Sequence, residues 1–137
     1  MFEFHGWSII RYDSHGTNSI KQAKCWEEIH DWINAKYKPW IEMRLITLNT
    51  YNDQNCIAIN GLHNHYDDWP VEIFKHISEY APGSYGLLYY NDDESKEFPN
   101  QFQVYRLAKS KLTYFEDSFL SPYIPIVEDE FDRNKED

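Results

Sequence analysis

The chain has 137 residues and a mass of 16.5 kDa, the size of a single compact domain. Its 13 basic and 23 acidic residues give a net charge of −10 and a pI near 4.9, which argues against direct nucleic-acid binding because phosphates repel such a surface. Charged residues make up 26% and hydrophobic residues 42% of the chain, the composition of a folded protein. Aromatic residues reach 18%, enough to build a core and to leave rings for contacts with a partner.

Nothing in the sequence indicates export or membrane insertion. Met1–Trp7 lacks the basic and apolar segments of a secretory signal, and no apolar stretch is long enough to cross a bilayer. Cys25 and Cys56 are the only cysteines and form no Cys-x-x-Cys pair. We therefore expect two buried thiols in a soluble, cytoplasmic protein with no membrane partner.

The first half of the chain is predicted to contain a strand over residues 2–11, a helix over residues 19–36, and strands over residues 43–51 and 54–60. The helix is predicted from apolar residues at three- and four-residue spacing, namely Ala23, Trp26, Ile29 and Ile33. Pro39 is expected to close this helical region. Asn52-Asp53 separates the two later strands and is short enough for a hairpin.

The second half is predicted to contain a polar loop over residues 61–68, a second helix, a strand over 84–90, an acidic loop over 91–99, and strands over 101–108 and 111–115. Asp68 is expected to cap the second helix because Pro70 suits its first turn. Ala81-Pro82-Gly83 ends that helix. The prolines of Ser121–Pro125 favour an extended chain.

The order β-α-β-β-α-β, followed by a C-terminal hairpin, predicts an α+β fold in which two helices pack on one face of a mostly antiparallel sheet. The first six elements have the order of the split-βαβ, ferredoxin-like arrangement. We expect a single domain over residues 1–127. Residues 128–137 form an acidic tail that is expected to fray.

One pattern suggests metal chemistry. His63 and His65 could present both imidazoles on one side of an extended segment, with Asp67, Asp68 or His76 as a third metal ligand. This arrangement would make the chain a small metal-dependent hydrolase. The alternative, which we favour, is that these histidines are hydrogen-bonded scaffold or contacts with a partner.

No other pattern predicts catalysis. Ser84 follows Gly83 directly, whereas a nucleophile elbow needs one residue between the glycine and the serine. The sequence has no glycine loop that would cradle a phosphate, and carboxylate pairs are common in a chain with 23 acidic residues. We therefore predict no catalytic residue, no metal and no cofactor.

The acidic residues are clustered at 92–97, at 116–117 and from residue 128 onward. Clustered negative charge accelerates association with a basic protein, to ~10⁸–10⁹ M⁻¹s⁻¹ at low salt. Neighbouring rings could anchor such a partner, although each could equally belong to the core. The first predicted partner-binding residues are Asp92, Asp93, Glu94 and Glu97. A second set comprises His65, Tyr66, Asp67, Asp68 and Trp69.

Five segments carry a family resemblance: Met1–Trp7, Gly61–His65, Ala81–Tyr89, Phe102–Leu107 and Asp117–Pro125. In these segments, over residues 1 to 127, the chain resembles the immunity protein 7 family of bacterial polymorphic toxin systems, which include contact-dependent growth inhibition. The resemblance implies an antitoxin that binds the C-terminal toxin domain of an effector. Such toxins are often basic nucleases, including EndoU-type RNases. It also implies that the shared segments are scaffold, because immunity specificity tends to lie on variable surface.

The net negative charge also fits a different class of protein. The chain would then be an acidic adaptor, or a nucleic-acid mimic, whose partner is not a toxin. The position of the gene distinguishes the two, because an immunity gene should directly follow a large toxin gene.

Overall fold

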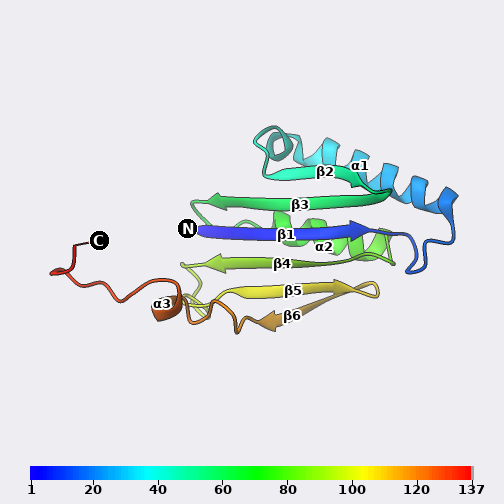
Figure 1. The fold of residues 1–137 in the computed structure, drawn as a ribbon. Helices are drawn as coiled ribbons and strands as arrows, with labels where there is room; N and C mark the ends of the chain where they lie inside the picture. Colours follow the sequence, from blue (N-terminus) through cyan, green and yellow to red (C-terminus); the bar gives the residue numbers. More distant parts are fainter. Residues whose placement is uncertain (137) are drawn as a thin grey trace.

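The structure, a computed structural model, describes residues 1–136 and forms three helices and a six-stranded sheet (Figure 1). In chain order the elements are β1 (Phe2–Ile10), α1 (Ser19–Glu42), β2 (Ile46–Tyr51), β3 (Gln54–His63), α2 (Trp69–Tyr80), β4 (Tyr85–Asp92), β5 (Gln103–Ala108), β6 (Lys111–Glu116) and α3 (Tyr123–Ile126). This order confirms the predicted α+β class with its C-terminal hairpin.

The sheet has the strand order β2-β3-β1-β4-β5-β6, and every neighbouring pair is antiparallel. Its centre is β1, which pairs with β3 on one side and with β4 on the other. The first six elements therefore form the predicted split-βαβ arrangement. The hairpin of β5 and β6 extends the sheet beyond β4.

Both two-residue hairpin loops use left-handed backbone conformations. Asn52 and Asp53 have φ of 48° and 62°, and Lys109 and Ser110 have φ of 50° and 62°. Two consecutive residues with positive φ are the requirement of a type I′ turn, whose twist matches that of the flanking strands. The hairpin predicted at Asn52-Asp53 is confirmed.

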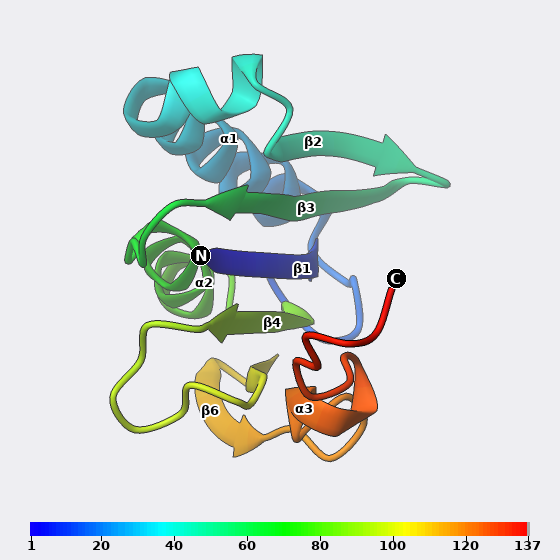
Figure 2. The ribbon, with the colours of Figure 1, turned by 90° about the vertical axis from the view of Figure 1, so that its left-hand side faces the viewer.

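Helices α1 and α2 cover the same face of the sheet. They lie behind it in Figure 1 and to its left in Figure 2. The expectation that Pro39 closes the first helical region is wrong, since α1 continues to Glu42. The chain instead bends at Tyr37, whose φ and ψ of −123° and 25° are not helical. Pro39 then lies in the first turn of a new helical segment, where its missing N–H leaves no bond unmade.

Two strands are longer than predicted because Phe2 pairs with both neighbours of β1. Its partners are His63 at the end of β3 and Asp92 at the end of β4. Gly61–His63 is consequently strand and not loop. Later in the chain, Pro122 and Ile124 are extended as predicted, but the N–H of Val127 bonds to the carbonyl of Tyr123 and closes the short turn of α3.

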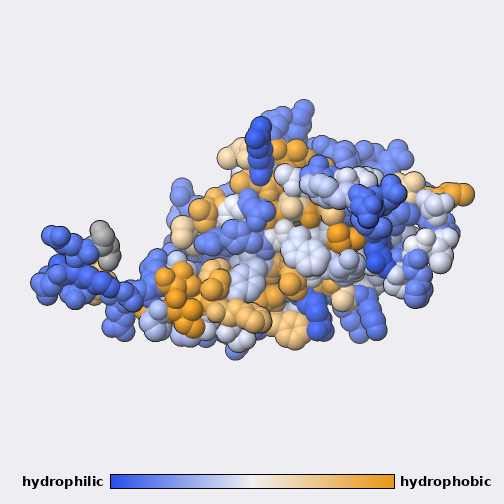
Figure 3. Space-filling view, in the orientation of Figure 1, coloured by the Kyte–Doolittle hydropathy of each residue, from blue (hydrophilic) through white to orange (hydrophobic). Residues whose placement is uncertain are grey.

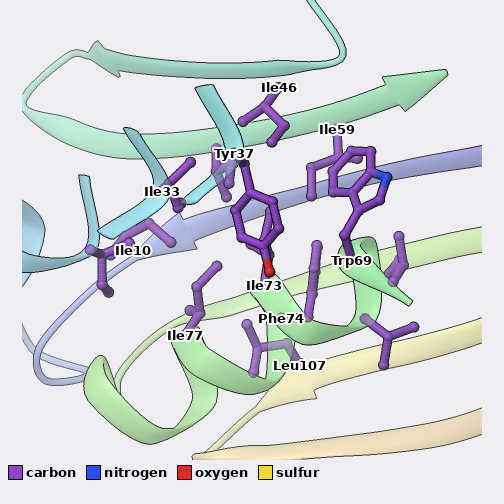
Figure 4. Close-up of a cluster of buried hydrophobic side chains, with 14 of the residues drawn as sticks. Ile10, Ile33, Tyr37, Ile46, Ile59, Trp69, Ile73, Phe74, Ile77 and Leu107 are labelled. Atoms are coloured by element: carbon purple, nitrogen blue, oxygen red, sulfur yellow. The ribbon is translucent and has the colours of Figure 1, made fainter. Parts of the chain in front are cut away.

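The core lies between the helices and the side chains that the central strands direct towards them (Figure 4). Its fully buried members include Phe2, Phe4, Ile10, Ile57, Ile59 and Leu88 from the sheet and Ile29, Ile33, Ile73, Phe74 and Ile77 from the helices. Because successive side chains of a strand alternate between faces, the intervening residues point to the opposite side of the sheet.

We call that opposite side the open face. It is formed by Glu3, His5, Trp7 and Ile9 of β1, Tyr85, Leu87 and Tyr89 of β4, Val104 and Arg106 of β5, and Thr113 and Phe115 of β6. Figure 2 shows α3 and the C-terminal segment on this side of the sheet, away from α1 and α2.

The two cysteines are free thiols. Cys25 is buried, and burial raises the pKa of its thiol to about 11. Cys56 is only partly buried, so the expectation of two buried thiols holds for Cys25 alone. Within residues 1–136, none of the helices has the length and hydropathy of a membrane span.

Candidate functional site

The predicted contact segments meet at one end of the sheet, where β1 begins and β3 and β4 end. Asp92 is the last residue of β4, and Glu97 lies in the loop that follows. His65 belongs to the connection between β3 and α2, and its Nδ1 lies 2.7 Å from Oε1 of Glu94. This contact joins two loops that are far apart in the sequence.

Internal partners neutralise part of the charge of the acidic loop. The hydrogen bond with His65 holds the pKa of Glu94 below its usual value, and the α-amino group of Met1, 3.7 Å away, acts in the same direction. That amino group is 2.5 Å from Oδ1 of Asp93. Asp92 accepts a hydrogen bond from the N–H of Glu94 at 3.1 Å. The loop is therefore an ordered structure and not a loose run of acids.

Carboxylates from two further segments reach the same end of the sheet. The hydroxyl of Tyr123 in α3 donates to Oε1 of Glu128 at 3.1 Å. Burial raises the pKa of this hydroxyl, followed by the hydrogen bond and charge of Glu128 and by the charges of Glu3 and Asp93. Acidic residues from β1, from the 92–97 loop and from the segment after α3 thus act on one side chain.

We call this region the acidic end, comprising Glu3, Asp92, Asp93, Glu94, Glu97 and Glu128. Sequence reasoning assigned Glu128 to a solvated tail and did not single out Glu3. The signal for Glu3 was its place in β1, where Phe2 and Phe4 on either side belong to the core face.

Three predicted residues lie in the turn before α2 and are exposed. Tyr66 nevertheless places its ring 4.9 Å from that of Phe2, and burial raises the pKa of its hydroxyl. Asp68 occupies the capping position, but its side chain makes no capping bond. Asp67 accepts the N–H of Trp69 instead, at 3.3 Å. The position of the cap was predicted correctly and the capping interaction was not.

Trp69 is not available as a contact residue, because only 3% of it is exposed. Its ring stacks on Trp40 at 5.9 Å and meets the edge of Phe4 at 5.1 Å. As the first residue of α2 it points from the helix onto the sheet (Figure 4). It fixes the start of α2 to the core and supports the turn that carries the exposed residues before it.

The histidine pair does not assemble a metal centre from residues 1–136. His63 has its Nε2 engaged by the indole of Trp69 at 3.0 Å. His76 stacks on Trp32 with centroids 3.6 Å apart and on Tyr80 with centroids 4.3 Å apart. In this part of the chain the group of potential ligands that converges is Asp92, Asp93 and Glu94. It contains neither His63 nor His65.

Two residues of the Ala81–Tyr89 segment, Ser84 and Gly86, have structural roles. Ser84 is 2% exposed and its hydroxyl accepts the N–H of Arg11 at 2.9 Å, which links the segment to the end of β1. A Cβ on Gly86 would lie 2.0 Å from the carbonyl oxygen of Trp7. Both residues therefore serve the close approach of β4 to β1.

These features define a small α+β domain with one strongly acidic end. The sequence profile of immunity protein 7 matches residues 1–129, and the chain belongs to this family. The resemblance seen in the sequence is thereby confirmed. Family membership makes the chain an immunity protein whose cognate partner is a toxin. Searches among curated proteins and solved structures found no match.

Proposed function

We propose that the chain neutralises the C-terminal toxin domain of a bacterial polymorphic toxin by covering its active site, without performing chemistry itself. The toxin we expect is a basic nuclease such as an EndoU-type RNase, delivered by contact or secretion. The antitoxin acts in the cytoplasm of the producing cell. Family membership supports the antitoxin role.

The observation that carries the nuclease proposal is the acidic end. A nuclease must attract phosphates and therefore presents cationic groups around its active site. Carboxylates gathered from β1, the 92–97 loop and the segment after α3 offer the same sign of charge as its substrate. Such complementarity steers encounter and rejects neutral or acidic partners.

Occlusion without chemistry requires one bound antitoxin for every toxin molecule. Because a single free nuclease continues to degrade its target, the complex must be long-lived. We expect a dissociation constant in the nanomolar range or below, which corresponds to a binding free energy of about −12 kcal/mol or more negative. The acidic end supplies fast association, and contacts beyond it must supply slow dissociation.

Co-expression tests this proposal. The toxin domain encoded by the gene directly before that of this chain is induced in a bacterial host, with and without the chain. We expect growth arrest without it and normal growth with it, while an unrelated immunity protein of similar charge gives no rescue. Continued growth arrest with well-expressed soluble chain would contradict the proposal.

A further inference from the structure

The open face carries an apolar groove of about 390 Å³ over β4, β5 and β6. Its walls include Leu87, Tyr89, Val104, Arg106, Phe115 and Phe119, and Glu116–Ser118 complete the lining. Figure 3 shows this side of the molecule, where hydrophobic residues gather over the lower strands and α3 while the C-terminal tail is hydrophilic. Exposed apolar surface that is contiguous in this way is typical of protein interaction sites.

The apolar surface continues from the groove onto β1. Trp7 lies opposite Leu87 in the pairing of β1 with β4, and its ring meets the edge of Tyr85 at 5.9 Å. Both rings and Leu87 are more than 40% exposed. Aromatic residues with one face in solvent are the residue types that most often dominate binding energy at interfaces.

Phe119 is held out in solvent by an ordered turn and not by chance mobility. It is 84% exposed. The buried carboxylate of Asp117 accepts the N–H of Phe119 at 2.8 Å, that of Leu120 at 2.9 Å and the hydroxyl of Ser121 at 2.8 Å. Burial opposes the ionisation of Asp117, but the hydroxyl of Tyr89, together with these hydrogen bonds, holds its pKa below the usual value. The turn therefore stays formed, and a partner would not have to order it.

The groove and part of the acidic end lie on the same face of the sheet. Glu3 of the acidic end, His5 and Trp7 follow one another along the open face of β1, and the last two lie opposite Tyr89 and Leu87 of the groove wall. A partner that engages Glu3 is therefore already on the face that carries the groove.

Charge decides which occupant fits. A second copy would bring another net charge of −10 to the same surface, and the two acidic ends would repel each other. A cationic partner is attracted to the acidic end and carries its own surface residues to the groove. We propose that the groove is the anchoring site for an aromatic or aliphatic side chain of the toxin domain, flanked there by basic residues; this inference rests on the proposed function.

The two regions then have separable kinetic roles. The acidic end acts over distance and sets the association rate, whereas the groove acts only after contact and sets the dissociation rate. Replacement of Phe119 by alanine removes a ring that is 84% exposed and so contributes little to the core, and we expect the variant to fold. Its expected effect is a dissociation rate raised about tenfold or more, with little change in association.

The experiment uses the toxin domain from the adjacent gene, inactivated in its active site, and measures association and dissociation rates by biolayer interferometry. Phe119→Ala and Leu87→Arg are compared with the wild-type chain. Ile20→Ala is the matched control, because Ile20 is an apolar residue that is 81% exposed on α1, on the other side of the sheet. Far-ultraviolet circular dichroism verifies that each variant is folded.

The proposal predicts faster dissociation of both groove variants and no change for Ile20→Ala. Unchanged dissociation of both groove variants would contradict the anchoring site and leave the proposed function intact. Failure of the wild-type chain to bind would contradict the proposed function itself. Sedimentation velocity of the free chain supplies the remaining outcome: a dimer that Phe119→Ala dissociates would show that a second copy fills the groove, and would overturn the proposal.

Discussion

The indole N–H of Trp69 donates a hydrogen bond to Nε2 of His63 at 3.0 Å. Nε2 must be unprotonated to accept it, so the proton of the neutral ring is on Nδ1. The indole is fixed in turn by its packing on Phe4 and Trp40. A metal ion at Nε2 would have to displace a buried side chain, which makes His63 a structural histidine at the end of β3.

Metal binding tests this assignment. We expect that the purified chain binds no zinc with one-to-one stoichiometry, because Nε2 of His63 is engaged by Trp69 and neither histidine belongs to the group of potential ligands that converges within residues 1–136. Isothermal titration with zinc chloride and elemental analysis after dialysis measure the stoichiometry. One zinc per chain, removed by both His63→Ala and His65→Ala, would contradict the assignment and revive the hydrolase alternative.

Reversing the charge of the acidic loop should slow association with the toxin domain. In Asp92→Lys/Asp93→Lys/Glu94→Lys we expect the association rate at low ionic strength to fall by about tenfold or more and to depend less on salt. Stopped-flow measurements at several salt concentrations record both effects. The matched control carries the same change in net charge on the exposed face of α1, at Glu27, Glu28 and Asp31. Equal rates for the two triple variants would exclude the loop from the interface.

Gly86→Ala should destabilise the fold through a contact between two backbones. Its Cβ would lie 2.0 Å from the oxygen of Trp7 and 2.8 Å from Cα of Ser8, and neither can move without separating β1 from β4. We expect the free energy of unfolding in urea to fall by about 3 kcal/mol, the upper range for overpacking.

Gly16→Ala serves as the comparison for that variant. Gly16 has φ of 65° but nothing within 4 Å of an added Cβ, so only the left-handed conformation costs energy there, about 1 kcal/mol. Equal losses in the two variants would show that the β1–β4 contact tolerates a methyl group.

His76 should make stability depend on pH. Burial lowers its pKa below the ordinary 6.5, with Lys36 acting in the same direction and Glu79 against it. The unfolded chain therefore takes up the proton first as pH falls, so stability is fully present above pH 6.5 and is lost progressively below it. The urea midpoint of the wild-type chain should drop between about pH 7.5 and about pH 5.5.

His76→Phe isolates this contribution, because phenylalanine can keep the stacking on Trp32 but does not titrate. We expect the midpoint of the variant to change less than that of the wild-type chain over the same pH range. All other titrating groups are shared by the two proteins and cancel in the comparison. Parallel pH profiles would mean that His76 takes up its proton as easily in the folded state as in the unfolded one.

The elements that follow from short-range chemistry were predicted well. Alternation identified β1, apolar periodicity identified α1 and α2, and Asn52-Asp53 identified a hairpin because both residues tolerate positive φ. Each of these signals is local, since it depends on residues a few positions apart. The order of the strands within the sheet could not be predicted in the same way. The order of elements along the chain does not specify which strands pair or in which register.

The features that were missed depend on tertiary contacts. Pro39 looked like a helix end because nothing nearby indicates that the chain already bends at Tyr37. Trp69 and Tyr66 stand in the same acidic turn, yet one is buried over β3 and the other is exposed. In the sequence Asp117 is one of an acidic pair with Glu116. In the structure its carboxylate is buried and accepts hydrogen bonds from the turn that follows it. In each case the partner that decides the outcome is distant in the sequence.

The most direct test of the central claim is a titration of the active toxin domain with the purified chain, in which RNA cleavage is measured at each point. Stoichiometric occlusion predicts that activity falls linearly and vanishes at one equivalent, and that intact, active toxin is recovered when the complex is separated in denaturant and refolded. Loss of activity at far less than one equivalent, or toxin that stays covalently altered after separation, would show that the chain acts by chemistry and not by binding.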